Sequence, residues 1–168
     1  MYRIAEFMRV SRQQFEKDWP FDAACPYDEI RLPKRATAGS AGYDFFAPFD
    51  FELHAGQSIV IPTGIRARMD AGWVLMLFPR SGHGFKYRVQ LSNTVGVIDS
   101  DYFGAANEGH CMVKLVNANH EGKILRVQKG EAFAQGVFLP FGITIDDSAD
   151  AERIGGFGST TQKSGENL

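Results

Sequence analysis

The stretch Asn93-Thr-Val-Gly-Val-Ile-Asp-Ser-Asp-Tyr-Phe-Gly104 places carboxylates at the end of a short apolar segment, between an amide and an aromatic ring. The segment up to Ile98 is typical of a strand, and the Asp-Ser-Asp sequence after it is typical of a turn. Asp99 is therefore expected at a strand end, ionised at neutral pH and able to accept a proton from water. Asp99 and Asp101 also fit a solvated turn, so other segments must decide between these interpretations.

Segments with the side chains of short strands lie on both sides of this stretch and are separated by Gly, Pro or Asp at intervals of roughly ten residues. This spacing favours an all-β sandwich or barrel. A length of 168 residues suits one domain and is too short for two ordinary ones. The predicted strands span residues 58–61, 65–69, 73–78, 112–116, 124–127 and 133–139.

A short helix is predicted near the start of the chain, before these strands. Ser11 begins a capping-box pattern, Phe15 and Trp19 are four residues apart on one face, and Pro20 stops the run. We expect this helix to pack on the outside of the barrel. At the other end, residues 153–168 are rich in Gly, Ser and Thr and are predicted to be mobile unless a ligand binds them.

The composition excludes several classes of protein. The formal net charge is −2 and 44% of the residues are hydrophobic, so the chain lacks the basic excess of a nucleic-acid-binding protein. No apolar run reaches the length of a membrane span, and the first residues lack the layout of a signal peptide. We therefore expect a cytoplasmic protein that binds neither nucleic acid nor membrane. Its two cysteines, Cys25 and Cys111, are too far apart for a zinc knuckle and are expected to be reduced.

Two further segments carry groups that suit phosphate. Arg80 follows a predicted strand and can grip an anion with two N–H groups, while Ser81 and the backbone around Gly82 would line a small anion nest. The sequence Gly156-Phe-Gly-Ser-Thr160 adds hydroxyl and N–H groups beside a ring that could lie flat on a base. Each segment alone is a weak signal, and the second also fits a flexible tail.

Two polar residues in apolar segments complete the pattern. Asp44 is expected at the start of a strand, and Gln135 lies within one, where a buried amide needs partners. Taken in order, these segments resemble the homotrimeric dUTPases, a family that cleaves dUTP to dUMP and pyrophosphate. The resemblance runs from about residue 31 to residue 161. Its motifs are Ala41-Gly-Tyr-Asp44, Arg80-Ser-Gly82, Gly96-Val-Ile-Asp-Ser-Asp-Tyr102, Gly130-Glu-Ala-Phe-Ala-Gln135 and Gly155-Gly-Phe-Gly-Ser-Thr160.

The resemblance implies a β-clip or jelly-roll-like fold, a distorted barrel within one dUTPase-like domain over residues 1–168. Residues 1–30 would be an N-terminal extension of this domain, and residues 153–168 would be a C-terminal tail that acts as a lid. In the family the active sites lie between the chains of a homotrimer. Every site would then need all of the subunits.

Roles toward water, base and sugar are also implied by the resemblance. Asp99 would be the base that activates water for in-line attack on the α-phosphorus. Asn93 and the strand backbone beside Gly96 would bind uracil and leave no room for the methyl group of thymine. Tyr102 would pack beneath the deoxyribose, where a 2′-hydroxyl would clash.

The resemblance assigns the phosphates to a second group of residues. Arg80, Ser81 and Gly82 would hold phosphate groups, and Gln135 would reach the α-phosphate region. Asp44 would be an outer-shell partner, through water, of a Mg²⁺ ion that the phosphates of dUTP chelate, which fits a metal that keeps its waters. The tail would close over the nucleotide and exclude water. Its binding residues would be Arg153, Phe157, Gly158, Ser159 and Thr160.

The chain departs from the common family pattern in four places. Arg153 is four residues before Phe157, one closer than usual, which weakens its assignment to a phosphate. Ala132 stands where many members have Arg. Residues 105–109 form an insertion after the catalytic turn, and residues 1–30 lie outside the ordinary family core. Packing is the simpler interpretation of the N-terminal residues, and a partner surface is the alternative.

Two other functions stay open. The dCTP deaminases resemble this family in fold but need a glutamate on the strand after the third motif, where this chain has Lys114. A lysine cannot replace a carboxylate that moves protons at C4 of cytosine. A regulatory protein could instead keep the pocket to sense dUTP without hydrolysing it, although the presence of Asp99 argues against this. The histidines have no metal-like spacing, and one of them lies in the predicted phosphate loop; they are His54, His83, His110 and His120.

Overall fold

The structure, a computed structural model, describes residues 2–151, 153 and 155. Strands dominate this part of the chain, with two α-helices and two short 3-10 helices between them. The first elements are β1 (Ala5–Arg9), α1 (Arg12–Asp18), η1 (Tyr27–Glu29), β2 (Lys34–Arg35), β3 (Tyr43–Phe46), β4 (Phe51–Leu53), β5 (Ser58–Pro62) and β6 (Ile65–Met69). The others are β7 (Trp73–Pro79), α2 (Ser81–Tyr87), β8 (Val89–Leu91), β9 (Gly96–Ile98), η2 (Ser100–Gly104), β10 (Met112–Asn117), β11 (Leu125–Val127) and β12 (Ala132–Pro140).

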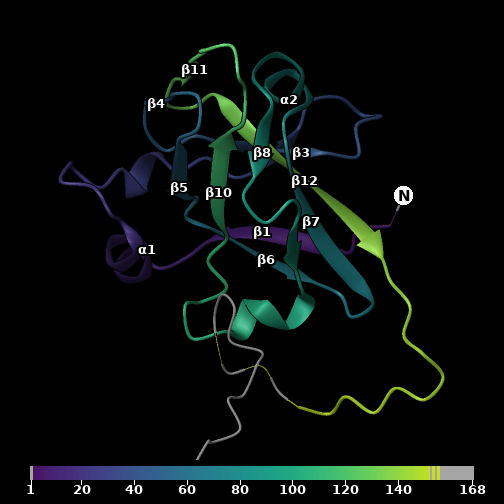
Figure 1. The fold of residues 1–168 in the computed structure, drawn as a ribbon. Helices are drawn as coiled ribbons and strands as arrows, with labels where there is room; N and C mark the ends of the chain where they lie inside the picture. The colour runs from purple at the N-terminus through teal and green to yellow at the C-terminus, as the bar shows by residue number, and fades with distance from the viewer. Residues whose placement is uncertain (1, 152, 154, 156–168) are drawn as a thin grey trace, which may run out of the picture.

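The described strands form four antiparallel sheets. The largest has the order β2-β3-β12-β7-β9, and a second has the order β5-β10-β8. The pairs β1-β6 and β11-β4 form two-stranded sheets. Figure 1 shows the two longest strands, β7 and β12, side by side in the largest sheet. The predicted all-β, jelly-roll-like class is confirmed, but each sheet has free edge strands, so the sheets do not close into a barrel.

The core consists of large apolar side chains on the inner faces of these sheets. In β10, Val113 and Leu115 are fully buried whereas Lys114 between them is exposed. This alternation is typical of an antiparallel strand with one face on the core. Phe45 of β3 and Phe133 of β12 are among the largest fully buried side chains. Burial of each such ring contributes about 2 to 3 kcal/mol of hydrophobic free energy, which ties the largest sheet to the core.

The predicted N-terminal helix is confirmed as α1. Ser11 is its N-cap and accepts a hydrogen bond from the backbone N–H of Gln14, and Trp19 is its C-cap, directly before Pro20. Phe15 is fully buried, and its ring centroid lies 5.5 Å from that of Trp19. This aromatic face holds α1 at the side of the molecule (Figure 1).

The six predicted strands correspond to β5, β6, β7, β10, β11 and β12, and their ends differ from the predictions by at most one residue. Sequence analysis missed β1, β2, β4 and β8, which lie at sheet edges, and of these β2, β4 and β8 have only two or three residues. It also missed α2, because the sequence Ser-Gly-His-Gly-Phe-Lys-Tyr contains two glycines and has low helix propensity.

Both cysteines are free thiols, as predicted. Cys111 is fully buried, and burial raises the pKa of its thiol to about 12, so it stays protonated. No helix in the described part of the chain is long and apolar enough to cross a membrane. The predicted lid residues Phe157, Gly158, Ser159 and Thr160 lie outside the described residues.

Candidate active site

One row across the five-stranded sheet brings two predicted site residues together. Gln135 of β12 lies directly opposite Asp44 of β3 on one side and opposite Phe78 of β7 on the other. Directly opposite residues point to the same face of a sheet. A Cβ atom on Gly42 would lie 2.8 Å from Oε1 of Gln135, so the absence of a side chain there leaves room for the amide. The close approach of Gln135 therefore explains why the first motif has a glycine at position 42.

Arg80 joins this row from the end of β7. Its Nε atom lies 3.5 Å from Oδ1 of Asp44, and its backbone is the N-cap of α2. Ser81 and Gly82 are exposed in the first turn of that helix. The predicted anion nest therefore takes the form of a helix N-terminus, where unpaired backbone N–H groups suit an anion. We call Asp44, Arg80 and Gln135 the register group, because strand pairing sets their positions.

A cavity of about 340 Å³ lies beside the turn between β8 and β9, which precedes Asp99. Asn93 and Gly96, both predicted to contact the base, are among its lining residues. A Cβ atom on Gly96 would lie 3.0 Å from the Cβ of Leu77, so the close approach of β9 to β7 requires a small residue. The lining is mostly apolar, and it includes Lys114 but no carboxylate; the full set is Val60, Leu91, Ser92, Asn93, Gly96, Met112 and Lys114.

Asp99 follows β9 and bonds Arg153. Nη2 of Arg153 donates to Oδ2 of Asp99 at 2.5 Å, and its Nε donates to Oδ1 of Asp101 at 2.8 Å. The two aspartates thus share one guanidinium, and the Arg153 side chain is only 15% exposed. The structure therefore places Arg153 on the turn after β9 of its own chain, whereas the resemblance assigned it to a phosphate.

Tyr102 lies in η2 and is only 4% exposed. Its hydroxyl donates to the backbone carbonyl of His110 at 3.0 Å and accepts a hydrogen bond from Nδ2 of Asn107 at 2.8 Å. The guanidinium of Arg153 lies 5.7 Å from the centroid of the Tyr102 ring. Burial is the main cause that raises the pKa of Tyr102, so its hydroxyl keeps its proton. We call Asp99, Asp101 and Tyr102 the turn group.

Sequence reasoning missed Asn107 and His110 as neighbours of this group. The insertion itself was visible in the sequence, but neither residue belongs to a motif or to a periodic pattern. Only the departure from the family spacing marked the segment.

The turn group and the register group lie at different ends of the five-stranded sheet. Ile98, next to Asp99, pairs with Leu75, whereas Gln135 pairs with Phe78. Phe78 is three positions after Leu75, and Asp99 is one position beyond Ile98. The offset between Asp99 and Gln135 is therefore four residues along the strands and two strands across. Standard strand spacings make this separation on the order of 16 Å. Gln135 also leans toward β3, away from β9, so one chain does not bring both groups to one phosphorus atom.

His83, in the first turns of α2, is half-buried. Burial is the main cause that lowers the pKa of its ring, and the charge of Arg80 lowers it further. Its Nδ1 atom is buried and has no hydrogen-bond partner among the described residues, while the ring hydrogen-bonds the backbone of Phe133. His83 therefore packs α2 against β12 as a neutral ring.

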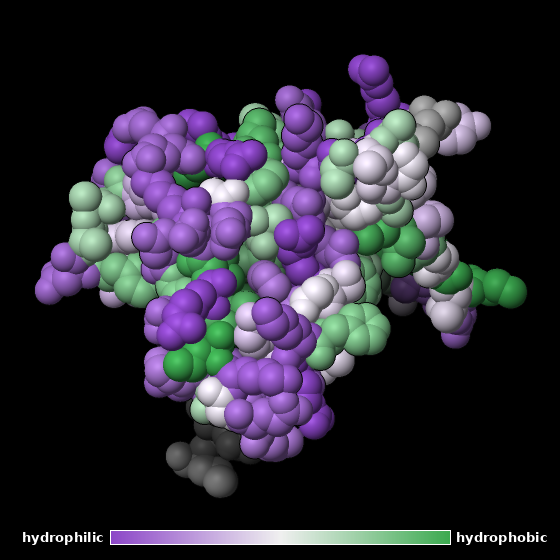
Figure 2. Space-filling view, turned by 90° about the horizontal axis from the view of Figure 1, so that it is seen from above, coloured by the Kyte–Doolittle hydropathy of each residue, from purple (hydrophilic) through white to green (hydrophobic). Residues whose placement is uncertain are grey.

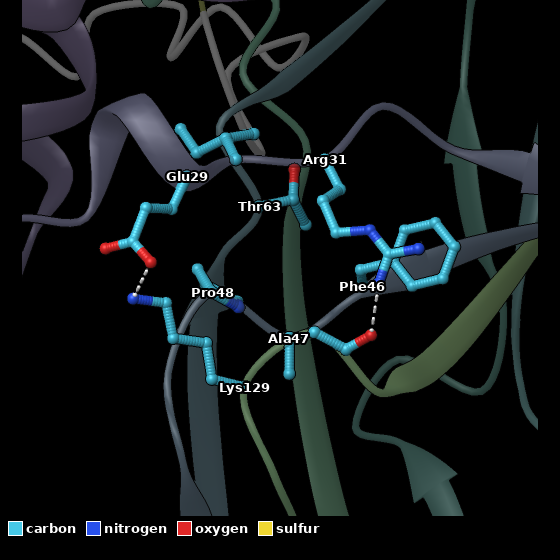
Figure 3. A pocket seen from close by; sticks show the side chains of 9 residues that line it. Glu29, Arg31, Phe46, Ala47, Pro48, Thr63 and Lys129 are labelled. Carbon is cyan, nitrogen blue, oxygen red and sulfur yellow. Dashed lines mark hydrogen bonds and ion pairs between the residues drawn. The ribbon is translucent and has the colours of Figure 1, made fainter.

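A second pocket, of about 270 Å³, lies between η1 and the end of the pairing between β3 and β12. Figure 3 shows Glu29 and Lys129 joined across it and Arg31 beside the ring of Phe46. Nζ of Lys129 lies 2.6 Å from Oε2 of Glu29, and Nη1 of Arg31 donates to the carbonyl of Gly130 at 2.8 Å. None of the predicted site residues lines this pocket, and both cations have partners. It belongs to the packing of residues 29–31 on the core.

The described residues contain no group of three or more His, Cys, Asp or Glu side chains arranged for a metal ion. Asp44 offers a single carboxylate, 21% exposed beside Arg80. One carboxylate does not suit a metal enclosed by protein ligands, but it suits a metal that other groups hold and that keeps its waters.

Comparison with known proteins gives a consistent result. A family model described as dUTPase matches residues 28–161. Deoxyuridine 5′-triphosphate nucleotidohydrolase of Lactococcus lactis subsp. lactis is 43% identical over 134 residues, which cover 78% of this chain and 88% of that protein. The crystal structure of dUTPase from Streptococcus mutans superposes with a TM-score of 0.64 at 37% identity and covers 82% of this chain and 97% of that one. A mutant dUTPase from phage phi11 of S. aureus, which coordinates a structural Mg(II) ion, shares the fold with a TM-score of 0.61 at 17% identity, over 89% of this chain and 98% of that one.

Proposed function

Because this chain belongs to the dUTPase family, we propose that it hydrolyses dUTP to dUMP and pyrophosphate with Asp99 as the base. The observation that carries the proposal is the position of Asp99 at the end of β9, three residues after Gly96, which lines the cavity beside Asn93. Two of the cavity's lining residues and the carboxylate thus lie on one short stretch of chain. A nucleotide with its base in the cavity would direct its phosphates past Asp99.

In the proposed reaction a water molecule attacks the α-phosphorus and Asp99 takes a proton from it. The new bond joins the water oxygen to the α-phosphorus, and the bond from that phosphorus to the oxygen bridging to the β-phosphorus breaks. Pyrophosphate leaves with that oxygen. The hydrogen bond from Arg153, 2.5 Å long, covers one Asp99 oxygen, so Arg153 must move before water can bind there.

The cavity supports a uracil base and argues against deamination. Asn93 has both a donor and an acceptor for a base edge, and the close packing of β9 on β7 at Gly96 leaves little room beside it. Lys114 lines the same cavity at the position where a deaminase needs an acid. This chain therefore lacks the acidic residue that carries protons in a dCTP deaminase. A protein that only senses dUTP would not need the carboxylate of Asp99.

The register group suits the phosphates. Arg80 and the exposed first turn of α2, with Ser81 and Gly82, supply a positive charge and N–H donors, and Gln135 supplies an amide. Asp44 would hold Mg²⁺ through water, and the ion would neutralise charge on the phosphates. The tail residues would close over the nucleotide, with Arg153 exchanging Asp99 for a phosphate; they are Arg153, Phe157, Gly158, Ser159 and Thr160.

The distance between the two groups supports a site shared between chains of a homotrimer. A phosphate held by Gln135 lies far from Asp99 of the same chain, so the register group of a neighbouring chain would have to meet the turn group. In a closed ring, the same contact repeats for each subunit.

Exposed apolar side chains support the same assembly. Phe85 of α2 is 92% exposed and Val97 of β9 is 55% exposed. Exposed apolar side chains of this size often mark a surface that binds another protein chain. Figure 2 shows that one face of the molecule carries separate hydrophobic patches among hydrophilic residues. Burial between subunits would remove such side chains from water.

Purified protein assayed for pyrophosphate release with dUTP, dCTP, dTTP and UTP tests the activity directly. We expect dUTP to be hydrolysed far better than the other three nucleotides, since the cavity and Tyr102 exclude them sterically or leave polar groups unpaired. Ammonia release from dCTP would instead support a deaminase. Tight dUTP binding without hydrolysis would support a sensor.

The shared site is tested by mixing two inactive variants. One carries Asp99→Asn, and the other carries both Arg80→Ala and Gln135→Ala. If each site takes Asp99 from one chain and the register group from another, random co-refolding in equal amounts restores about a quarter of the sites. If every chain supplied both parts, hybrid trimers identified by mass would stay inactive.

A further inference from the structure

The insertion at residues 105–109 folds back onto the catalytic turn. Glu108 and Gly109 have φ angles of 58° and 71°, so two consecutive residues adopt the left-handed conformation that reverses the chain. A Cβ atom on Gly109 would lie 2.6 Å from the carbonyl oxygen of Tyr102 and 2.8 Å from the Cα of Phe103. The backbone of the insertion is therefore pressed against the backbone of η2.

The side chain of Asn107 has a fixed orientation in this segment. Its Oδ1 atom accepts a hydrogen bond from the N–H of Gly109 at 3.3 Å, which leaves Nδ2 to donate to the hydroxyl of Tyr102 at 2.8 Å. The same hydroxyl donates its proton to the carbonyl of His110 at 3.0 Å. A phenol has one proton, so the bond from Asn107 must run in this direction. The two bonds restrain the position of the Tyr102 ring at its far end.

Residues from other parts of the chain hold the insertion itself. The Glu108 carboxylate accepts hydrogen bonds from the backbone N–H of Ser11 at 2.7 Å and from the Ser11 hydroxyl at 2.6 Å. Nδ1 of His110 bonds Asp18 at 2.6 Å, and Nε2 of His110 accepts from the N–H of Gly64 at 2.7 Å. The insertion is thus fixed between α1 and the chain segment that leads into β6, so Asn107 cannot easily move away from Tyr102.

Arg153 links the ring of Tyr102 to the carboxylate of Asp99. Arg153 lies over the ring with its guanidinium 5.7 Å from the centroid and bonds Asp99 with the same group. Departure of Arg153 would leave the ring face and Asp99 open side by side. The inference below rests on the proposed function, in which the deoxyribose packs against this ring.

We propose that Asn107 is a positioning residue for sugar selection. By fixing the Tyr102 hydroxyl, Asn107 holds the ring at the distance from the deoxyribose that leaves no room for a 2′-hydroxyl. The matched dUTPase family segment begins at residue 28, so α1 precedes it and supports Tyr102 from outside that segment.

The test compares kcat/KM for dUTP with kcat/KM for UTP in two variants. Asn107→Ala removes the bond, and Asn107→Asp keeps the shape but replaces the donor by an acceptor. We expect the dUTP preference to fall about fivefold in each, the weight of one neutral hydrogen bond. Asn119→Ala is the matched control, because this buried amide bonds Asn117 and Lys123 in the turn after β10. It should lower thermal stability without changing the dUTP preference.

A double-mutant cycle distinguishes positioning from general loosening of the fold. Tyr102→Phe should lower the dUTP preference by a similar factor, and adding Asn107→Ala to it should have no further effect, because the hydroxyl through which Asn107 acts is gone. If Tyr102→Phe changes the preference and both Asn107 variants do not, the inference is overturned and the proposed function stands. If Tyr102→Phe also leaves the preference unchanged, the hydroxyl does not set the position of the ring and the inference is overturned. Absence of dUTP hydrolysis in the parent protein would overturn the proposed function itself.

Discussion

The register group and the turn group are held in place by different interactions. Asp44 and Gln135 meet because their backbones pair in neighbouring strands, so their positions follow from the register of one sheet. The Tyr102 hydroxyl accepts a hydrogen bond from the side chain of Asn107 and donates one to the backbone carbonyl of His110. The His110 ring in turn bonds Asp18 of α1. Strand register survives the change of a single side chain, whereas a buried hydrogen-bond network depends on each of its members. The two regions should therefore respond differently to substitution.

The largest expected effect is on the chemical step in the turn group. Asp99→Asn keeps the shape of the side chain but cannot take a proton, so we expect kcat for dUTP to fall by roughly 10²- to 10⁴-fold, the usual weight of a general base. Melting temperature and dUTP binding should change little, because the Asp99 side chain is 49% exposed. A kcat within tenfold of the parent would remove Asp99 from this role.

The next largest effect is expected when the Gln135 side chain of the register group is displaced without loss of stability. In Gly42→Ala the new methyl group would lie 2.8 Å from Oε1 of Gln135 and should displace that side chain. Because a misplaced group at a reactive centre is costly, we expect kcat/KM to fall roughly 10- to 100-fold. Stability should stay close to that of the parent, since the contacted atom is the end of a flexible chain.

Gly39→Ala is the matched control for this prediction. No atom lies within 4 Å of the position that its Cβ would take, so activity and stability should both be unchanged. Equal activity of the Gly42 and Gly39 variants would show that the Gln135 side chain is not needed where the structure places it.

A smaller effect is expected on the stability of the contact between the start of α1 and residues 105–109. Ser11→Ala removes the N-cap of α1 and one partner of Glu108, and loss of such a cap costs about 1 kcal/mol of unfolding free energy. Urea denaturation measures this cost, with Ser58→Ala at the exposed start of β5 as the control. An unchanged midpoint in the Ser11 variant would contradict the proposed docking of α1 through the insertion.

The smallest expected effect is the pH dependence that His110 contributes. Burial is the main cause that lowers the pKa of His110, while the hydrogen bond with Asp18 and the charges of Asp18 and Glu108 oppose it. Nε2 accepts the N–H of Gly64, so protonation would place two hydrogens against each other. A ring with a lowered pKa in the folded state binds its proton more readily when unfolded. Stability should therefore be complete above the usual histidine pKa of about 6.5 and decline as the pH falls through that value.

Urea midpoints between pH 5 and pH 8 measure this decline. In His110→Asn the slope with pH should be shallower than in the parent, even though the variant is less stable at every pH. Ser58→Ala, at an exposed position without a titratable group, serves as the control and should keep the parental slope. An identical slope in the His110 variant would show that this ring does not set the pH response.

The sequence was sufficient for features that depend on local pattern. Alternating apolar residues predicted β10 and β12, and the capping residue Ser11 predicted the start of α1, because both patterns follow from the geometry of one element. The order of the motifs indicated the family and the residues Asp99, Asn93 and Gln135 as site candidates. Their proposed roles in catalysis and binding stay predictions.

Tertiary structure decided the features that depend on contacts between distant segments. The sequence shows Gly42 and Gln135 far apart, and only the pairing of β3 with β12 explains why the glycine has no side chain. The glycine-rich α2 forms against its own helix propensity, and its His83 ring hydrogen-bonds the backbone of Phe133 in β12. One partner of Tyr102, Asn107, lies in a segment without a motif, and residues of α1 and of the chain before β6 hold that segment in place. Local sequence specifies which elements form, but burial and hydrogen bonding across the folded chain determine which side chains meet.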